Sequence, residues 1–112
     1  MDCIFCKIAA GTIPAKKVRE DELVFAFHDI EPKAPAHILV IPKKHVASLA
    51  EAKEIDEKLL GRLLLAAADI AREQRLENGY RLVISTGAEG GQTVDHLHAH
   101  LLGGRALSWP PG

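Results

Sequence analysis

Three histidines stand at every second position of the stretch D95-H-L-H-A-H-L-L-G-G104, directly before two glycines. On a β-strand, successive side chains point to opposite faces of the sheet, whereas on a helix a spacing of two residues gives no common face. We therefore predict a strand over residues 94–102, in which the apolar residues between the histidines face a core. The histidine row then lies on one face and consists of His96, His98 and His100.

The rest of the chain predicts an α+β fold with a five-stranded, mainly antiparallel sheet, one long helix and one short helix. The long helix is expected at 56–77, where apolar residues recur at helical spacing behind Asp56, a candidate cap, and before the stop signal Asn78-Gly79. Residues 87–91, G-A-E-G-G, are expected to form a glycine-rich loop. The other predicted elements are a short helix at 4–9, a hairpin at 18–27, strands at 37–41 and 80–85, and a helical turn at 48–51 with capping-box spacing.

Length and composition limit the classes of protein to which the chain can belong. Its 112 residues, 47% of them hydrophobic, suit a single domain spanning 1–112. A net charge of -1 gives no basic surface for nucleic acid and no polybasic patch for a membrane. No apolar run approaches the roughly 20 residues of a membrane span, and the N-terminus lacks the pattern of a secretory signal. We therefore expect a cytoplasmic protein without nucleic-acid or membrane partners.

Two kinds of chemistry use several histidines on one face of a strand. Neighbouring histidines can chelate zinc, but His96 and His100 lie roughly 13 Å apart along an extended strand, so one ion for all three is geometrically difficult. Alternatively, the central imidazole is a nucleophile, and its neighbours supply donors for charge that develops on the substrate. Histidine suits this task because its pKa lies near neutral pH. Chance seldom produces such a row, so a functional site is favoured over three inert polar residues.

The glycine-rich segment G87-A-E-G-G-Q-T93 directly precedes the histidine strand. Glycines such as Gly91 let backbone N–H groups approach an anion closely, and Gln92 and Thr93 add side-chain donors. A glycine-rich loop alone is usually only a turn. Its place beside the histidines favours a phosphate cradle, made of neutral donors because the segment contains no lysine or arginine.

The histidine stretch and five further segments together resemble one protein family, the histidine triad (HIT) family. H96-L-H-A-H-L-L102 resembles its signature, in which three histidines alternate with apolar residues. The other segments resemble the HINT branch of nucleoside phosphoramidases, over nearly the whole chain, in order and with matching gaps. They are F27-H-D-I30, A36-H-I-L-V-I-P-K-K-H45, G90-G-Q-T93, G103-G-R105 and W109-P-P-G112.

The resemblance implies a HIT-like homodimer in which two five-stranded sheets join into one continuous sheet. It also implies hydrolysis of the P–N bond of purine nucleoside phosphoramidates, with aminoacyl-adenylates as alternative substrates and no cofactor required for catalysis. His98 is then the nucleophile and forms a covalent nucleotidyl-histidine, which water cleaves to AMP. His100 contacts the phosphoryl oxygens, and His96 helps to hold His98. His37 completes the histidine cluster from the adjacent strand, and Thr93 passes a proton to the leaving amine.

The resemblance also implies a nucleotide-binding set. Asp29 corresponds to the ribose-binding carboxylate, which fits a diol because a carboxylate accepts two hydrogen bonds. Without the resemblance, Asp29 reads as an ordinary loop acid. Ser85, Gly91, Gln92 and Thr93 lie at the phosphate or leaving group. The apolar slot for the base consists of Phe5, Ile8, Phe27, Ile30 and Leu39, which read equally well as ordinary core residues.

Three positions depart from the family pattern. Ser85 stands where the family often has asparagine, so one ligand contact is lost or bridged by water. Asp95 stands where an aromatic residue is common, and Ala99 is small for its apolar position. None of the three touches the nucleophile, so the departures bear on the level of activity and on the preferred leaving group.

Cys3 and Cys6 form a C-x-x-C pair, which by spacing is half of a zinc site. In the cytosol, such cysteines are reduced thiols or metal ligands rather than a structural disulfide. Some bacterial relatives of HIT type bind zinc with such a pair and two histidines, which correspond here to His45 and His96. The zinc would be structural and would close the N-terminus onto the sheet. The alternative is two small buried thiols that meet no metal.

Two other functions remain open. A dinucleoside polyphosphate hydrolase of a sister HIT branch is disfavoured because G103-G-R105 and W109-P-P-G112 fit the HINT branch better. A non-catalytic nucleotide-binding or interaction module is disfavoured because it would not need a nucleophile between two further imidazoles. In the family the C-terminal end lies near the partner's active site, so Trp109 is expected to influence substrate choice, unless the tail packs on its own subunit.

Overall fold

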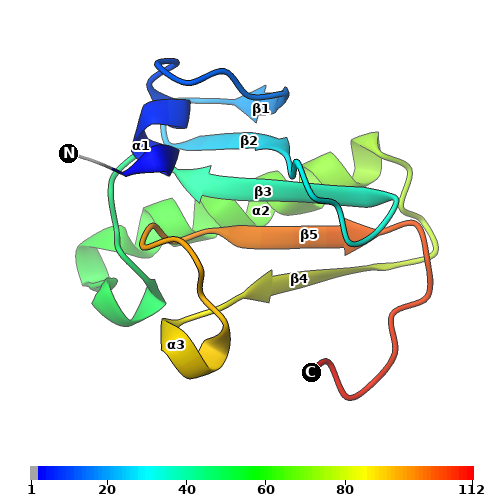
Figure 1. Ribbon diagram of the computed structural model, residues 1–112. Helices are drawn as coiled ribbons and strands as arrows, with labels where there is room; N and C mark the ends of the chain where they lie inside the picture. The colour runs from blue at the N-terminus through cyan, green and yellow to red at the C-terminus, as the bar shows by residue number, and fades with distance from the viewer. Residues whose placement is uncertain (1–2) are drawn as a thin grey trace.

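The computed structural model describes residues 3–112 and contains one five-stranded antiparallel sheet in the order β1-β2-β3-β5-β4 (Figure 1). This confirms the predicted α+β fold. The strands are β1 (Lys17–Glu20), β2 (Val24–His28), β3 (Ala36–Pro42), β4 (Tyr80–Ile84) and β5 (Ala99–Gly103). The helices are α1 (Ile4–Ala9), α2 (Glu57–Glu73) and α3 (Gly87–Gly90), and two 3-10 turns cover Leu49–Glu51 and Glu54–Asp56.

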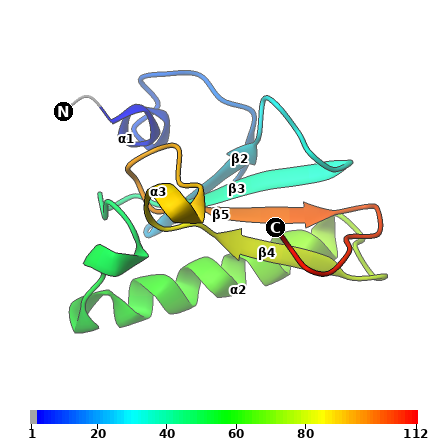
Figure 2. The same ribbon diagram turned by 60° about the horizontal axis from the view of Figure 1, so that its bottom comes forward.

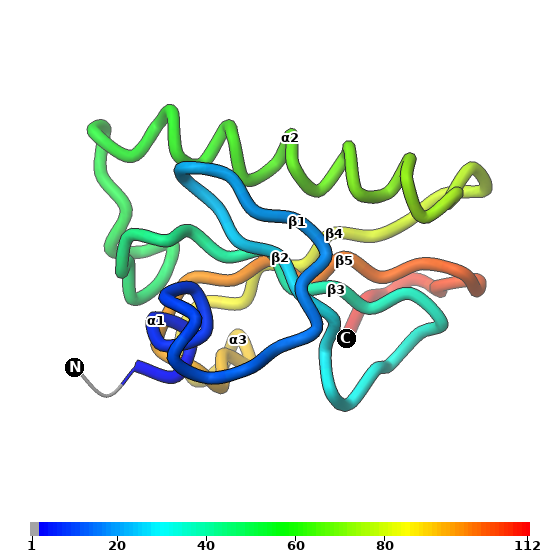
Figure 3. The backbone as a smooth tube through the Cα atoms, turned by 90° about the horizontal axis from the view of Figure 1, so that it is seen from above, coloured from blue at the N-terminus to red at the C-terminus, as the bar shows by residue number. Residues whose placement is uncertain are grey.

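The two faces of the sheet are covered by different elements. Helix α2 runs along one face, and α1 lies on the other (Figure 2). Seen along the sheet, α3 lies on the same side as α1 (Figure 3). Because strand residues alternate between faces, β2 and β3 each supply residues to both cores. The core under α2 includes Val24, Ala26, Ile38, Val40, Leu63, Ala67, Ile70, Leu97, Ala99 and Leu101. The smaller core under α1 consists of Phe5, Ile8, Phe25, Phe27, Leu39 and Ile41.

Helix α2 ends four residues before the predicted end at 77. Arg75 takes a left-handed conformation with φ 58°, and Leu76 then packs against β5. A Cβ on Gly103 would lie only 2.7 Å from Leu76 Cδ1, so this contact requires glycine on the strand. We attribute the early end of α2 to this tertiary contact, which precedes the predicted stop signal Asn78-Gly79 in the sequence. Within residues 3–112, no helix is both long enough and apolar enough to cross a membrane.

The predicted caps are placed differently in the structure. Asp56 directly precedes α2, but its carboxylate accepts from the backbone N–H of Lys53 at 3.0 Å and from Lys44 Nζ at 2.7 Å. It therefore closes the preceding 3-10 turn rather than capping α2. The helical turn predicted at 48–51 is present, but the Ser48 side chain makes no capping hydrogen bond within the described chain.

The last strand is shorter than the predicted 94–102, because it begins only at Ala99. Its last pairing with β3 joins Ala99 to Val40, and the backbone N–H of Leu97 donates instead to Val46 O at 2.7 Å, outside the sheet. The expected glycine-rich loop at 87–91 is also partly wrong, because residues 87–90 form the short helix α3. Gly91 ends this helix with φ 84°, a left-handed conformation that favours glycine.

Candidate active site

A cleft of about 700 Å³ opens on the sheet face that carries α1. It lies over the middle of the sheet and is bounded by α1, the segment 13–16, the β2–β3 connection and the end of β4. The cleft gathers most of the residues predicted for the site from six separate segments. Those that line it are Phe5, Ile8, Phe27, Asp29, Ile30, His37, Leu39, Ser85, Thr93, His98 and His100.

The ring of His98 is fixed by a main-chain acceptor. Its Nδ1 lies 2.7 Å from the carbonyl oxygen of His96. A carbonyl oxygen only accepts, so the Nδ1–H of His98 donates, and in the neutral ring Nε2 carries the lone pair. The edge-on ring of Phe5, with a centroid distance of 5.1 Å, supports the imidazole from the side. In this tautomer of a histidine that lines the cleft, Nε2 is the nitrogen that can act as a nucleophile.

His37 and His100 form a hydrogen-bonded pair whose direction follows from the main chain. The backbone N–H of Lys33 donates to His37 Nδ1 at 3.0 Å, so the proton of a neutral His37 is on Nε2. His37 Nε2 lies 2.9 Å from His100 Nδ1 and donates to it. The proton of His100 is then on Nε2. His100 is thereby prepared to donate a hydrogen bond to a ligand in the cleft.

Both rings of this pair are held in the neutral form. Burial, followed by the neighbouring His98 and His37, lowers the pKa of His100 to about 4. Burial also lowers the pKa of His37, against the opposing effect of the Asp29 carboxylate. Neutral rings are the state in which one nitrogen donates and the other accepts, so the pKa shifts agree with the hydrogen-bond directions.

Asp29 contacts the histidine pair as well as the cleft. Its Oδ2 lies 3.4 Å from His37 Nε2, and its Oδ1 accepts from the backbone N–H of Glu31 at 2.8 Å. The family resemblance implied a ribose-binding role for Asp29 but gave no sign of the contact with His37. Lys33 was missed entirely, because it acts through its backbone N–H and any residue type except proline supplies one.

Gln92 and Thr93, predicted as neighbours at the phosphate, differ in their surroundings. Gln92 Nε2 donates to Ala47 O at 2.7 Å and to Val94 O at 2.9 Å, and its Oε1 accepts from Gly87 N at 3.0 Å. Its amide therefore braces the α3 segment. Thr93 lines the cleft itself. Gln92 therefore has a supporting position, whereas Thr93 lines the cleft together with His98 and His100.

The four predicted metal ligands Cys3, Cys6, His45 and His96 come together beside the cleft, with all ligand atoms within 4.8 Å of one another. His96 Nδ1 lies 3.2 Å from Cys3 Sγ, 3.5 Å from Cys6 Sγ and 3.2 Å from His45 Nδ1. Cys6 Sγ lies 3.3 Å from His45 Nδ1. Zinc–ligand bonds near 2.0–2.3 Å give a tetrahedral site edges of roughly 3.3–3.8 Å, so these four separations would need to widen only slightly around an ion.

The orientation of His96 also fits a metal. Its Nε2 lies 2.8 Å from Pro42 O, so Nε2–H donates and the lone pair on Nδ1 points at the cysteines. Burial lowers the pKa of His96, which favours the neutral ring that a metal needs. The residues present therefore fit a Cys2His2 zinc site.

The C-terminal tail lies against its own subunit. Arg81 Nη2 donates to the carbonyl oxygens of Leu107 at 3.2 Å and Ser108 at 2.9 Å, and Pro111 lines the cleft. Trp109 is 82% exposed. The tail thus packs on its own subunit, which was the predicted alternative to a role across a dimer interface, and Pro111 adds to the cleft wall.

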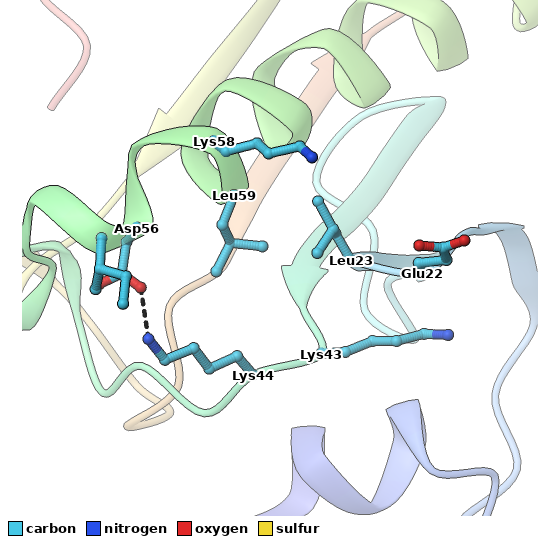
Figure 4. Close-up of a pocket in the computed structure, with 8 residues that line it drawn as sticks. Glu22, Leu23, Lys43, Lys44, Asp56, Lys58 and Leu59 are labelled. Atoms are coloured by element: carbon cyan, nitrogen blue, oxygen red, sulfur yellow. Dashed lines mark hydrogen bonds and ion pairs between the residues drawn. The ribbon is translucent and has the colours of Figure 1, made fainter.

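A second, smaller hollow of about 290 Å³ has no histidine in its lining (Figure 4). Lys44 Nζ is paired with Asp56 at 2.7 Å, as Figure 4 shows, and Lys43 Nζ is paired with Glu20 at 2.7 Å. These ion pairs satisfy two of the positive charges that an anionic ligand would need. The hollow is lined by Glu22, Leu23, Lys43, Lys44, Ile55, Asp56, Lys58 and Leu59. The histidine cleft is therefore the candidate active site.

The chain is thus an α+β domain with an antiparallel sheet and one cleft. The cleft contains His98, whose Nε2 can act as a nucleophile, and the hydrogen-bonded pair His37 and His100. The chain belongs to the HIT domain family, which matches residues 10–107. It is 58% identical, over 99% of its length and 97% of the relative's, to an uncharacterized HIT-like protein of Synechococcus elongatus. The crystal structure of a HIT family hydrolase from Legionella pneumophila is similar with a TM-score of 0.98 and 51% identity, covering 99% of this chain and 100% of that one. A histidine triad nucleotide-binding protein from Candida albicans has a TM-score of 0.84 and 34% identity, covering 97% and 83%.

Proposed function

We propose that the protein is a purine nucleoside phosphoramidase, which hydrolyses the P–N bond of adenosine 5′-phosphoramidates to AMP and an amine. The observation that carries this proposal is the His98 ring, whose Nδ1–H is engaged by the His96 carbonyl so that Nε2 faces the cleft as a nucleophile. The names of two similar proteins, a HIT family hydrolase and a histidine triad nucleotide-binding protein, support hydrolysis and a nucleotide ligand.

The reaction has two displacements at the α-phosphorus. The lone pair of His98 Nε2 attacks phosphorus while the P–N bond breaks, and the leaving amine takes up a proton relayed from water by the Thr93 hydroxyl. Water then attacks the nucleotidyl-histidine and releases a proton to the solvent, which replaces the proton given to the amine, while the P–Nε2 bond breaks and its electron pair returns to Nε2, so that AMP leaves with His98 restored. His100 Nε2–H donates to the phosphoryl oxygens as they gain charge, and His37 holds His100 in the tautomer that can do so.

The nucleoside is held at the other end of the cleft. We assign the ribose hydroxyls to Asp29 and the base to a slot walled by Phe5, Ile8, Phe27 and Leu39. These four apolar side chains are buried, so they serve the core and the slot together. Ile30 is 93% exposed at the rim and acts only by covering a bound base. Ser85, Gly91 and the backbone around Thr93 complete the phosphate end.

The test is the intact mass of the protein after rapid mixing with an adenosine 5′-phosphoramidate and an acid quench. We expect a transient adenylyl adduct and AMP release in the wild type and neither in His98→Ala. His28→Ala, which removes an exposed histidine from the rim of the same cleft, is the matched control and keeps the adduct. AMP binding without an adduct would favour a non-catalytic module, and faster cleavage of a diadenosine polyphosphate would favour the sister branch of hydrolases.

We further propose one structural zinc per chain on Cys3, Cys6, His45 and His96. When bound, the metal supplies a fixed tetrahedral cross-link among these residues and no part of the P–N chemistry. Their thiols stay reduced in the cytoplasm, where we place the protein as one domain spanning residues 1–112. Metal analysis of protein purified without chelators should give about one zinc per chain, and Cys3→Ser with Cys6→Ser should abolish it. Sub-stoichiometric metal in the wild type contradicts the site.

We propose that the protein is a homodimer joined at the β4 edge. Strand β4 is an outer strand of the sheet, and its Tyr80 is 46% exposed. On the neighbouring helix α2, Leu64 and Leu65 are also exposed. Light scattering should give twice the chain mass, and Leu64→Lys with Leu65→Lys should shift it to the monomer. A monomeric wild type overturns the dimer and leaves the catalytic assignment untouched.

A further inference from the structure

Helix α1 depends on tertiary contacts for its position. It is only six residues long, and a helix this short is not stable alone in water. Within the described chain, the hydrogen bonds of its backbone run between neighbours in the segment 3–13, and no strand ladder holds it. It lies on the cleft face of the sheet, away from α2 (Figure 3). Side-chain contacts must therefore fix the helix against the sheet.

One set of side chains on α1 forms a wall of the cleft. Ile4, Phe5 and Ile8 line it. The ring of Phe5 packs edge-on against His98 at 5.1 Å and against His96 at 5.9 Å, as centroid distances. A base in the proposed slot would lie against this wall. The slot therefore exists only while α1 stays in place.

The other set consists of the cysteines at the start of the helix. Cys3 caps α1, because its Sγ accepts from the backbone N–H of Cys6 at 3.3 Å. The two histidines that face these sulfurs come from elsewhere: His45 follows β3, and His96 precedes β5. The cluster thus joins three separate segments at one point, and α1 is the segment with the weakest independent support.

We propose that a metal ion on this cluster latches α1 as the wall of the nucleotide cleft, so that metal occupancy sets the affinity for the nucleotide. The latch rests on the nucleotide site and the zinc proposed above. The nucleophile is held separately, because His96 Nε2 donates to Pro42 O and the His96 carbonyl accepts from His98. Loss of the metal therefore releases α1 and leaves His98 in place. Cys3 and Cys6 act through the metal as positioning residues.

The experiment measures the Kd of AMP by calorimetry for zinc-loaded wild type, for the same protein after a chelator, and after zinc is restored. Losing contact with one apolar wall should raise the Kd about tenfold, and zinc should reverse the rise. Amide hydrogen exchange should speed up in residues 4–13 of the chelated protein and stay unchanged in residues 99–103. In turnover the chelated protein should show a raised KM and a nearly constant kcat.

Three variants separate the latch from general destabilisation. Cys3→Ser with Cys6→Ser should reproduce the chelated state in every readout. Cys6→His, which replaces one zinc ligand by another, should keep both the metal and the affinity. Leu59→Ala removes a buried side chain on the opposite face of the sheet and should lower stability without changing the Kd. If the double serine variant does not fold, the comparison of chelated with reloaded wild type still decides the matter.

The possible outcomes distinguish the latch from the proposed function. A Kd for AMP that is the same with and without zinc overturns the latch, as does a Kd raised equally by Leu59→Ala. Exchange that rises as much in residues 99–103 as in residues 4–13 also overturns it. Zinc-dependent AMP binding without cleavage of phosphoramidates upholds the latch and refutes the phosphoramidase. Absence of AMP binding in both states, or of stoichiometric zinc, overturns the latch.

Discussion

His96 and His98 stand two residues apart, yet their rings are used in opposite ways. The Nε2–H of His96 donates to the Pro42 carbonyl, which leaves Nδ1 directed at the two cysteines. The Nδ1–H of His98 donates to the His96 carbonyl, which leaves Nε2 in the cleft. In each ring, a main-chain acceptor selects the tautomer, and the tautomer decides which nitrogen can bind a metal or attack phosphorus.

Histidines that alternate along one stretch of sequence therefore need not belong to one functional site. The two histidines are linked by a single hydrogen bond, through which the position of one affects the other. His98 instead lies beside His100, with a ring-centroid distance of 5.0 Å, and His100 is bonded to His37. Experiments can separate the proposed metal cluster around His96 from the proposed catalytic cluster around His98.

The largest effect is expected for His98→Ala. Loss of the nucleophile should lower kcat/KM for an adenosine phosphoramidate by at least about a thousandfold. The zinc content should stay at the wild-type value, because the four ligands are untouched. Steady-state kinetics and metal analysis on the same preparation check both statements. A parallel loss of zinc and activity would show that the two clusters are one site.

His96→Ala should have the reverse profile. The substitution removes a fully buried ring and leaves the Pro42 carbonyl without its donor, so the free energy of unfolding should fall by roughly 2–4 kcal/mol. Zinc should be lost, whereas kcat should fall far less than in His98→Ala because the His96 carbonyl remains. Urea unfolding, metal analysis and kinetics together decide this. A loss of kcat equal to that of His98→Ala would contradict separate roles.

A smaller effect is expected at His37. His37→Ala removes the donor that fixes His100, and kcat should fall about tenfold to a hundredfold with little change in KM. His37→Gln retains an N–H donor and should recover part of the loss. Equal rates in the two variants would show that His37 does not act through its hydrogen bond.

The smallest effect concerns the dependence of stability on pH. The pKa of His100 is about 4 in the folded protein, against an ordinary value of 6.5, chiefly because the ring is buried. Between these values the unfolded chain binds a proton that the folded chain does not. The free energy of unfolding should therefore fall as the pH is lowered from about 6.5 to about 4. Urea titrations should show a weaker dependence in His100→Gln, and an identical slope would contradict the assignment.

The sequence predicted correctly those helices and strands whose residue pattern lies within the element and its immediate neighbours. The strand residues 37–41 and 80–84, the short helix 4–9 and the start of the long helix all follow from periodicity and from flanking Pro or Gly. The extent of the last strand did not follow, because it depends on the Leu97 N–H donating to Val46 O instead of pairing with β3, a contact between residues distant in sequence. The end of α2 likewise depends on Leu76 meeting Gly103, a contact between residues distant in sequence.

The chemical groups of the site could be read directly from the sequence: the alternating histidines, a C-x-x-C pair and Asp29, in an order that matches the HIT family. The division of the histidines between two clusters could not be read there and became visible in the folded chain. That division depends on carbonyl and N–H groups of Pro42, His96 and Lys33, and main-chain groups carry no residue-specific signal. Folding alone brings these groups to particular ring nitrogens, and the chemistry of each histidine follows from that placement.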